Sequence, residues 1–175
     1  YFNEIKKNNY TVLGGPSLTP ITDSFIAKLS SLFYELKIGG GAPERYTKNN
    51  KKDIVDDWPM VNLIVEKKFL NQISNLDDSI WPGEDTELCC RIQKNNQSIK
   101  YIKDAFVYHH RRGSIMNHLR QIFNYGYNRT HLIKTKKIKM DIKSIIPIIF
   151  LLYNLLLIKL HTLSIVFILP IIIYL

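Results

Sequence analysis

The hydrophobic and polar positions along the first three quarters of the chain alternate between the spacing of short strands and that of helices. Runs rich in β-branched or aromatic residues, next to turn residues, predict short strands over 10–14, 61–65, 99–102 and 105–108. Apolar residues recurring every three or four positions predict helices over 22–37, 67–73, 84–94 and 114–133. Acidic residues in the first turn and basic residues in the last support the helix over 84–94.

A polar stretch rich in lysine and asparagine, from Glu44 to Asp57, interrupts this pattern. It offers little apolar surface to a core, so we expect a mobile loop. The functional alternative is a lid that closes over bound substrate.

The C-terminal block differs from the rest, because Lys159 and His161 are its only potentially charged residues between Ile145 and Leu175. As one helix it would be about 46 Å long, whereas the hydrocarbon core of a bilayer is about 30 Å thick. We therefore expect two membrane spans, over 144–158 and 160–175. Because the chain begins without methionine and stops within this apolar run, we expect it to be an internal fragment of a longer protein.

The net charge of +9 is concentrated just before the apolar block. The cluster comprises Arg129, Lys134, Lys136, Lys137, Lys139 and Lys143. Basic residues beside a membrane span predict a cytoplasmic location next to anionic lipid, and the amphipathic helix before them predicts a helix at the bilayer interface. Nucleic acid is the alternative partner for such charge, but no zinc-finger, helix-turn-helix or RNA-binding signature accompanies it, so we expect none.

The strongest local candidate for chemistry is the segment Trp81-Pro82-Gly83-Glu84-Asp85-Thr86-Glu87-Leu88. It combines a rigid turn, a pair of acids and the start of a helix. Free backbone N–H groups and the positive end of the helix dipole favour an ionised carboxylate there, which suits a general base. The alternative is that Glu84 and Asp85 only cap the helix.

Several segments, taken in order, resemble those of family 2 glycosyltransferases with C-terminal membrane helices. They are Val12-Leu13-Gly14-Gly15-Pro16-Ser17-Leu18-Thr19-Pro20, Asn62-Leu63-Ile64-Val65, the segment 81–88, and Val107-Tyr108-His109-His110-Arg111-Arg112, followed by Leu119-Arg120-Gln121, Tyr125-Gly126 and Arg129. The resemblance covers nearly the whole chain and implies the C-terminal part of such an enzyme.

The resemblance implies a fold and a location. Residues 1–113 would be the acceptor-side half of an α/β GT-A domain, 114–143 an amphipathic interfacial helix with a basic juxtamembrane segment, and 144–175 a transmembrane region whose second span is truncated. The protein would be a multi-pass protein of the cell membrane, with its catalytic part in the cytoplasm and membrane lipids as partners.

The resemblance also implies roles for single residues. Asp85 matches the catalytic base and Glu84 its acidic neighbour, while His109, rather than His110, matches a histidine near the metal. Substrate-binding positions are Asn62, Trp81, Arg111, Arg112, Arg120 and Gln121. The two adjacent arginines would neutralise the donor diphosphate or, alternatively, meet lipid phosphates. The divalent cation, Mn²⁺ or Mg²⁺, would be bound mainly by an Asp-X-Asp motif, which this chain lacks and which we expect upstream.

The implied activity is inverting transfer of a sugar from a nucleotide diphosphate sugar to a lipid-linked or cell-envelope glycan. Without the donor-binding half, the fragment alone is expected to be inactive. The chain lacks the Gln-X-X-Arg-Trp pattern of processive synthases, which favours addition of one or a few sugars. It also has Ser74-Asn75-Leu76-Asp77 where relatives often have Gly-Gly-Phe-Asp, a departure that concerns the local turn. The alternative is a catalytically silent membrane-bound scaffold of the same fold.

Overall fold

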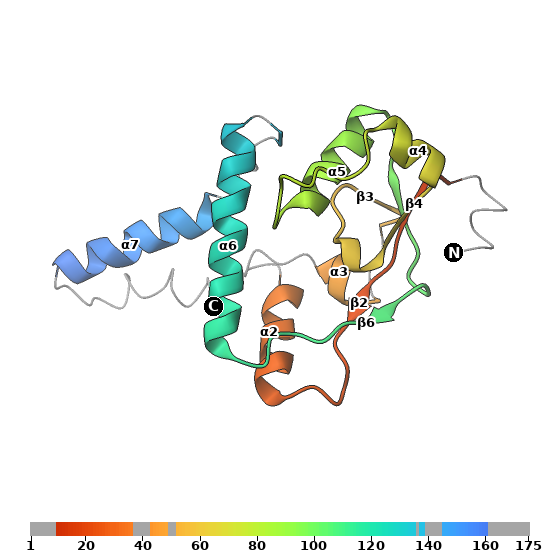
Figure 1. Ribbon diagram of the computed structural model, residues 1–175. Helices are drawn as coiled ribbons and strands as arrows, with labels where there is room; N and C mark the ends of the chain where they lie inside the picture. The colour runs from red at the N-terminus through yellow and green to blue at the C-terminus, as the bar shows by residue number, and fades with distance from the viewer. Residues whose placement is uncertain (1–9, 37–42, 49–51, 136, 139–144, 161–175) are drawn as a thin grey trace.

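A small mixed sheet organises the chain. The computed structural model describes residues 10–36, 43–48, 52–135, 137–138 and 145–160. Four strands pair in the order β3-β5-β1-β4 (Figure 1). They are β1 (Val12–Gly14), β3 (Ile54–Val55), β4 (Leu63–Val65) and β5 (Ile99–Tyr101). β1 runs parallel to β5 and antiparallel to β4, and β3 runs antiparallel to β5. A separate parallel pair joins β2 (Ser17–Leu18) to β6 (Val107–Tyr108).

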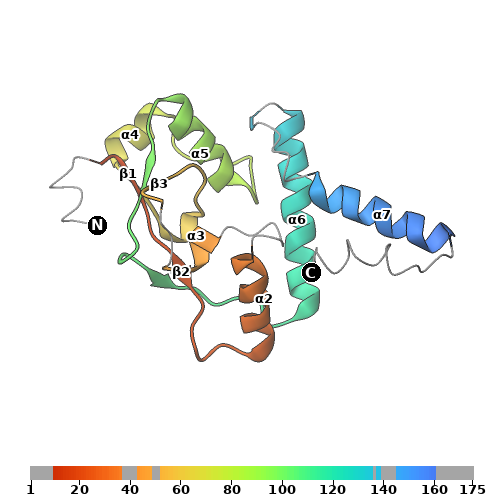
Figure 2. The ribbon, with the colours of Figure 1, turned by 180° about the vertical axis from the view of Figure 1, so that it is seen from behind.

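Helices surround the sheet largely where the sequence predicts them. They are α2 (Phe25–Glu35), α3 (Pro43–Tyr46), the 3-10 helix η1 (Met60–Asn62), α4 (Lys67–Gln72), α5 (Glu84–Lys94), α6 (Ile115–Lys134) and α7 (Ile146–Leu160). The four helices predicted from apolar spacing are confirmed as α2, α4, α5 and α6. Figures 1 and 2 show that α6 stands beside α2 and α5 and that α7 extends away from the sheet.

The core lies between α5 and the four-stranded sheet. Leu88, Cys89 and Ile92 of α5 are at most 1% exposed, and they pack in one cluster with Val12 and Ile99 of the sheet. Trp58, also fully buried, completes this cluster and donates from Nε1 to the carbonyl of Gly15 at 3.0 Å. Its backbone N–H donates to Sγ of Cys89 at 3.3 Å. The residues around Trp58 are therefore fixed to the same helix that carries Asp85.

The prediction of a mobile loop over 44–57 is wrong for the part of this stretch that the structure describes. Residues 43–46 form α3, and residues 54–55 form the edge strand β3. An ion pair of 2.8 Å joins Arg45 to Asp57, and the hydroxyl of Tyr101 donates to the carbonyl of Thr47 at 3.1 Å. Polar composition did not indicate this order because the stretch is stabilised by pairing with residues far away in the sequence.

The predicted membrane-spanning architecture is also corrected. The helix that overlaps the first expected span, α7, has 15 residues and runs through Lys159 to Leu160. This corresponds to about 22 Å, short of a hydrocarbon core of about 30 Å. Among residues 10–160, as far as they are described, no helix is both long and apolar enough to cross a bilayer. The multi-pass membrane localisation is therefore not supported. The second expected span, beyond residue 160, lies outside the described residues, and contact of the basic cluster with lipid stays a prediction.

The GT-A fold is corrected as well. The described strands contain only two or three residues each, and the sheet they form has β3 and β4 at its edges. The result is a small mixed α/β arrangement built around α5, and not half of an extended α/β sandwich. The resemblance of short segments in the same order did not determine strand length or pairing.

The turn after α4 shows the backbone consequence of the Ser74-Asn75 departure. Both residues have positive φ, 70° at Ser74 and 55° at Asn75. This left-handed region is open to glycine without cost and is tolerated by asparagine better than by most residues. The turn thus adopts a glycine-like conformation without glycine, and it leads the chain toward Asp77 and the start of α5.

Candidate functional site

A groove with a volume of about 360 Å³ lies between the turn that begins α5 and the face of α6. The turn contributes Trp81, Pro82, Gly83, Glu84 and Asp85; α6 contributes Asn117, Arg120, Gln121, Asn124 and Tyr125; and Arg112 precedes α6. Trp81 is 79% exposed at this groove. The groove therefore combines two carboxyl groups, two guanidinium groups, three amides and an exposed indole.

Both acids of the pair use one oxygen to satisfy the start of α5. Gly83 is the N-cap residue, with φ of 124°, and has no side chain that could cap. Oε2 of Glu84 accepts from the N–H of Gly83 at 2.8 Å, and Oδ1 of Asp85 accepts from the N–H of Thr86 at 2.8 Å. Capping and a place in the groove are thus compatible, because a carboxylate has two oxygens and each acid uses one for the backbone.

The protonation of Asp85 differs from the prediction. The free N–H groups were expected to favour the ionised form, but burial raises the pKa of Asp85 above its ordinary value of 3.8. The bond from Thr86 and the charge of Arg45 oppose this rise, while the negative charges of Asp57 and Glu84 add to it. Burial is the largest cause, because removing an ion from water outweighs one charge-assisted hydrogen bond. A carboxylate with a raised pKa accepts a proton more readily.

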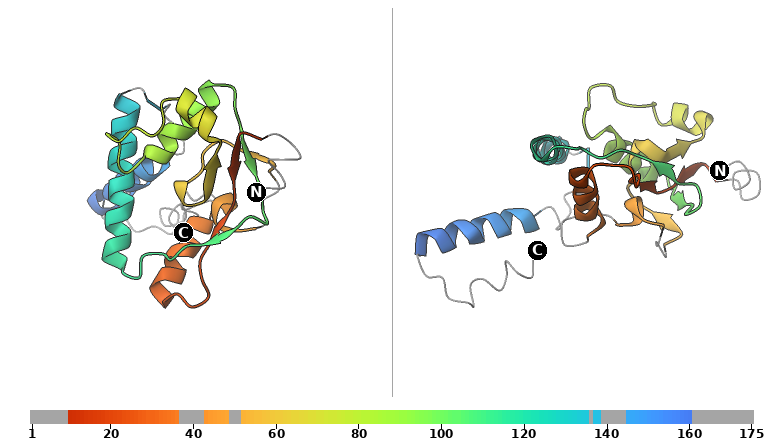
Figure 3. Two further views of the ribbon diagram at one scale, coloured as in Figure 1. Left: turned by 45° about the vertical axis from the view of Figure 1, so that its right-hand side comes forward. Right: turned by 90° about the horizontal axis from the view of Figure 1, so that it is seen from below.

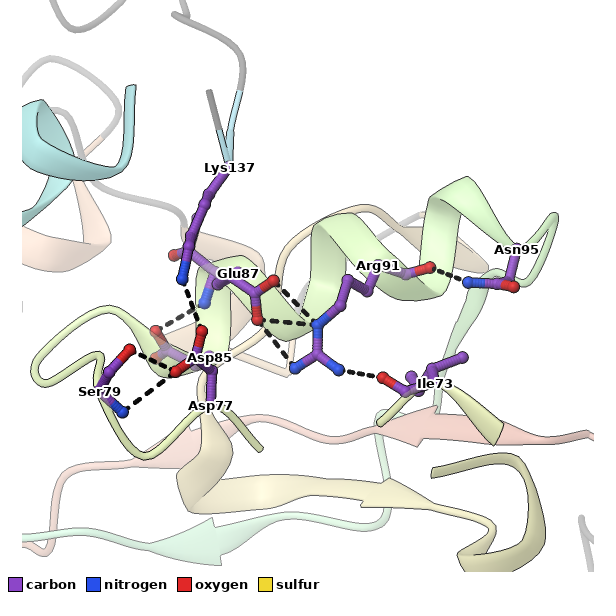
Figure 4. A network of polar contacts seen from close by, with 9 residues as sticks. Ile73, Asp77, Ser79, Asp85, Glu87, Arg91, Asn95 and Lys137 are labelled. Atoms are coloured by element: carbon purple, nitrogen blue, oxygen red, sulfur yellow. Dashed lines mark hydrogen bonds and ion pairs between the residues drawn. The ribbon is translucent and has the colours of Figure 1, made fainter. Parts of the chain in front are cut away.

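Contacts with the end of α6 fix the turn that carries the acids (Figure 4). Nζ of Lys137 lies 2.6 Å from Oδ2 of Asp77, and this pair lowers the pKa of Asp77 to about 2. Oδ1 of Asp77 also accepts from the N–H of Ser79 at 3.1 Å. Leu132 and Ile80 pack together as a small apolar cluster beside Gly83. These contacts therefore hold in place the turn that precedes Asp85.

The other end of α6 is fixed to α2. Nδ1 of His118 lies 2.8 Å from Oγ of Ser30, and the imidazole packs edge-on against the rings of Phe33 and Tyr34. Between these two contacts, one face of α6 forms a wall of the groove. The views of Figure 3 show α6 alongside the rest of the domain.

The amides on this wall include two that the sequence reasoning missed. Asn117 and Asn124 line the groove together with the predicted Gln121. Their spacing of four and three residues places all three on one face of a helix. This helical spacing is the sequence signal that could have identified Asn117 and Asn124.

The predicted substrate-binding residues fall into two groups. Trp81, Arg112, Arg120 and Gln121 line the groove with Asp85. Arg111 does not, because its guanidinium donates to the carbonyl of Ser17 at 2.7 Å and stacks on the ring of Tyr46 at 4.6 Å. Asn62 is buried and donates from Nδ2 to the carbonyls of Ala105, at 2.8 Å, and Pro16, at 3.2 Å. These two residues link β2, β6 and the chain around β4.

The predicted metal ligand is not among the residues that line the groove. The backbone N–H of His109 donates to the carbonyl of Leu18 at 2.9 Å, and burial together with the neighbouring arginines lowers the pKa of the imidazole. The next residue, His110, pairs with Asp23 instead. No group of three or more His, Cys, Asp or Glu side chains within the described part of the chain could bind a metal ion. These residues do not fit a divalent cation by themselves, so that cation stays a prediction, and no step below depends on it.

Comparison with known proteins does not identify a family. No family model matches the chain, and no curated protein or solved structure shows significant similarity to it. Membership of the glycosyltransferase family thus stays a prediction, and only the residues of the groove bear on function.

We expect Gly83→Ala to destabilise the protein. A Cβ at this position would lie 3.0 Å from Cδ1 of Leu132, and the backbone has φ of 124°. Such a conformation costs about 1–3 kcal/mol for a residue other than glycine. Thermal unfolding measures the loss.

Gly126→Ala in α6 is the matched control, since its Cβ would meet nothing within 4 Å. That change should raise stability by up to about 1 kcal/mol. Equal melting temperatures for Gly83→Ala and the unmutated protein would contradict the expectation.

Proposed function

We propose that this chain supplies the general base and the acceptor-binding groove of an inverting glycosyltransferase. The observation that supports the proposal best is the position of Asp85: its carboxyl group starts α5, has a raised pKa, and lines a groove with arginines, amides and an exposed tryptophan. A proton-accepting carboxylate beside groups that bind polyols and anions suits the activation of a sugar hydroxyl.

In the proposed reaction, Asp85 accepts the proton of one acceptor hydroxyl while that oxygen attacks the anomeric carbon of the donor sugar. The bond between this carbon and the diphosphate oxygen breaks, and the nucleotide diphosphate leaves with the electron pair. One base is sufficient for a single displacement, and the configuration at the anomeric carbon inverts. A correctly placed base of this kind contributes about 10²–10⁴ in rate.

The acceptor is proposed to be a glycan, free or linked to lipid. Trp81 offers a flat apolar face, and the side chains of Asn117, Gln121 and Asn124 offer both donors and acceptors to hydroxyl groups. Arg112 and Arg120 provide positive charge for an anionic group on the acceptor or the donor. Because the chain contains no Asp-X-Asp triplet, donor binding is proposed to need residues outside it.

The direct experiment incubates the full-length protein with a panel of nucleotide diphosphate sugars and oligosaccharide acceptors. We expect release of nucleotide diphosphate that depends on the acceptor, and a product of inverted anomeric configuration by NMR. A protein that binds glycans but consumes none of the donors would be a non-catalytic binding domain, and the proposal would be wrong.

We expect Gln121→Ala to weaken acceptor binding with little effect on the chemical step. The loss of one hydrogen bond to substrate costs about 0.5–1.5 kcal/mol, so the KM for the acceptor should rise about two- to tenfold with kcat little changed. Asn128→Ala is the matched control, because Asn128 is an amide on the same helix that donates to the carbonyl of Asn124 at 2.9 Å and does not line the groove. An equal rise in KM for both variants would remove Gln121 from acceptor binding.

A further inference from the structure

An ion pair joins Arg45 to Asp57 within the polar stretch 43–58. Nη2 of Arg45 lies 2.8 Å from Oδ2 of Asp57 and also donates to the carbonyl of Asp57 at 3.1 Å. The two side chains are only 24% and 28% exposed. Two bonds from one guanidinium group to one residue fix the position of both charges.

The backbone next to Asp57 is attached to the helix face that carries Asp85. Trp58 donates to Sγ of Cys89 from its N–H at 3.3 Å, and its carbonyl accepts from the same thiol at 3.5 Å. Cys89 lies four residues after Asp85, one turn along the same face of α5. The carbonyl of Asp56 accepts from the side chain of Gln93, a further turn along this face. The stretch 56–58 therefore runs along α5, with Trp58 bonded one helical turn after Asp85 and Asp57 next to Trp58 in the chain.

We propose that Arg45 and Asp57 are positioning residues that set how readily Asp85 takes up a proton. The inference rests on the proposed function for its consequence, because Asp85 acts on substrate and the ion pair acts through Asp85. The carboxylate of Asp57 disfavours a second negative charge nearby and so favours protonation. The guanidinium group of Arg45 offsets this effect and favours the ionised form of the base.

The remaining charged groups around Asp85 come from other elements. Glu84, on α5 itself, is a like charge that raises the pKa of Asp85. Arg112 and Arg120 line the groove on the opposite side, where substrate would bind. Of the charges from outside α5, Asp57 and Arg45 act most strongly on Asp85, and they act in opposite directions. These opposite signs give the proposal a test that general loosening of the fold cannot imitate.

The experiment follows the carboxyl carbon of Asp85 by ¹³C NMR during a pH titration of the whole chain, with Asp85→Asn used to assign the signal. Asp57→Asn should lower the pKa of Asp85, because a like charge is removed. Arg45→Met should raise it, because the carboxylate of Asp57 is then no longer offset. Loosening of the site would instead hydrate Asp85 and lower its pKa in both variants. Arg45→Lys keeps the charge and should leave the titration close to that of the unmutated protein.

Glu44→Gln is the matched control, since it removes a carboxylate from the same short helix, where Glu44 pairs with Lys52 at 3.7 Å. It should leave the titration unchanged. An unchanged pKa in Asp57→Asn, or a shift of the same sign in Asp57→Asn and Arg45→Met, would overturn the inference. If Arg45→Met does not fold, Arg45→Gln takes its place, because it also removes the positive charge. Because the titration requires no turnover, it can fail while sugar transfer is found, and it can succeed while transfer is absent.

Discussion

Asp85→Asn is expected to lower the rate of sugar transfer by about 10²–10⁴ in the full-length protein, with donor binding nearly intact. An amide cannot accept the proton of the acceptor hydroxyl. It can still accept the hydrogen bond from Thr86, which measures 2.8 Å in the unmutated protein. Initial rates with saturating donor and acceptor give the loss, and calorimetric titration with donor gives the affinity. Turnover within tenfold of the unmutated enzyme would show that Asp85 is not the base.

The same substitution should not destabilise the fold, which separates lost chemistry from lost structure. Because burial raises the pKa of Asp85, the folded state prefers the protonated carboxyl. The stability it contributes is fully present below its ordinary pKa of 3.8 and is lost as pH rises through the raised value. At pH 7 the ionised group is thus a cost that asparagine removes, and the melting temperature of Asp85→Asn should equal or exceed that of the unmutated protein. A lower melting temperature would contradict this reading of the burial.

The raised pKa also sets the pH dependence of the proposed reaction. A protonated Asp85 cannot act as a base, so the rate should fall as pH falls through the raised pKa. Glu84→Gln removes a neighbouring negative charge and should move this acid limb to lower pH. Removal of the charge of Asp57 should lower the pKa of Asp85, and removal of the charge of Arg45 should raise it. Substitutions at Glu84, Asp57 and Arg45 should therefore each shift the titration of Asp85.

Local pattern was sufficient to place the elements that carry the candidate site. The helix over 84–94 was predicted with both its bounds, because acids at its start and bases at its end mark its termini. The helix over 114–133 differs from α6 by one residue at each end, and Ser114 is its N-cap and not its first residue. The two helices that line the groove, α5 and α6, could therefore be predicted from the sequence.

Contacts between segments far apart in the sequence could not be predicted in this way. The strands over 99–102 and 105–108 follow each other in the sequence, yet β5 pairs with β1 and β6 pairs with β2. Residues 44–57 looked unstructured because their partners, such as the side-chain hydroxyls of Ser17 and Tyr101, lie elsewhere in the chain. The resemblance to a known family indicated a fold and a membrane location that the described structure does not support. The bounds of the helices α5 and α6 were easier to predict than the pairing of the strands.

Trp58→Ala is expected to cause the largest loss of stability among single substitutions in the core, about 3–5 kcal/mol. Trp58 is fully buried, it packs edge-on against Tyr101 with ring centres 5.5 Å apart, and a Cβ at Gly14 would lie only 2.9 Å from its ring. The indole ring thus fills its site closely, and its removal would leave a cavity. For a chain of this size, each kcal/mol lowers the melting temperature by about 2–4 °C.

Trp58→Phe separates the two contributions of the indole ring. Phenylalanine keeps most of the apolar packing but removes the Nε1 donor, so the carbonyl of Gly15 loses its 3.0 Å bond in a buried site. An unsatisfied buried carbonyl costs about 1–3 kcal/mol, and Trp58→Phe should therefore be less damaging than Trp58→Ala. Denaturant unfolding of both variants gives the two free energies. Both variants keep the bonds to Cys89, because the backbone N–H and the backbone carbonyl of residue 58 make them. A loss below about 1 kcal/mol for Trp58→Ala would mean that the core around α5 is less tightly packed than the structure shows.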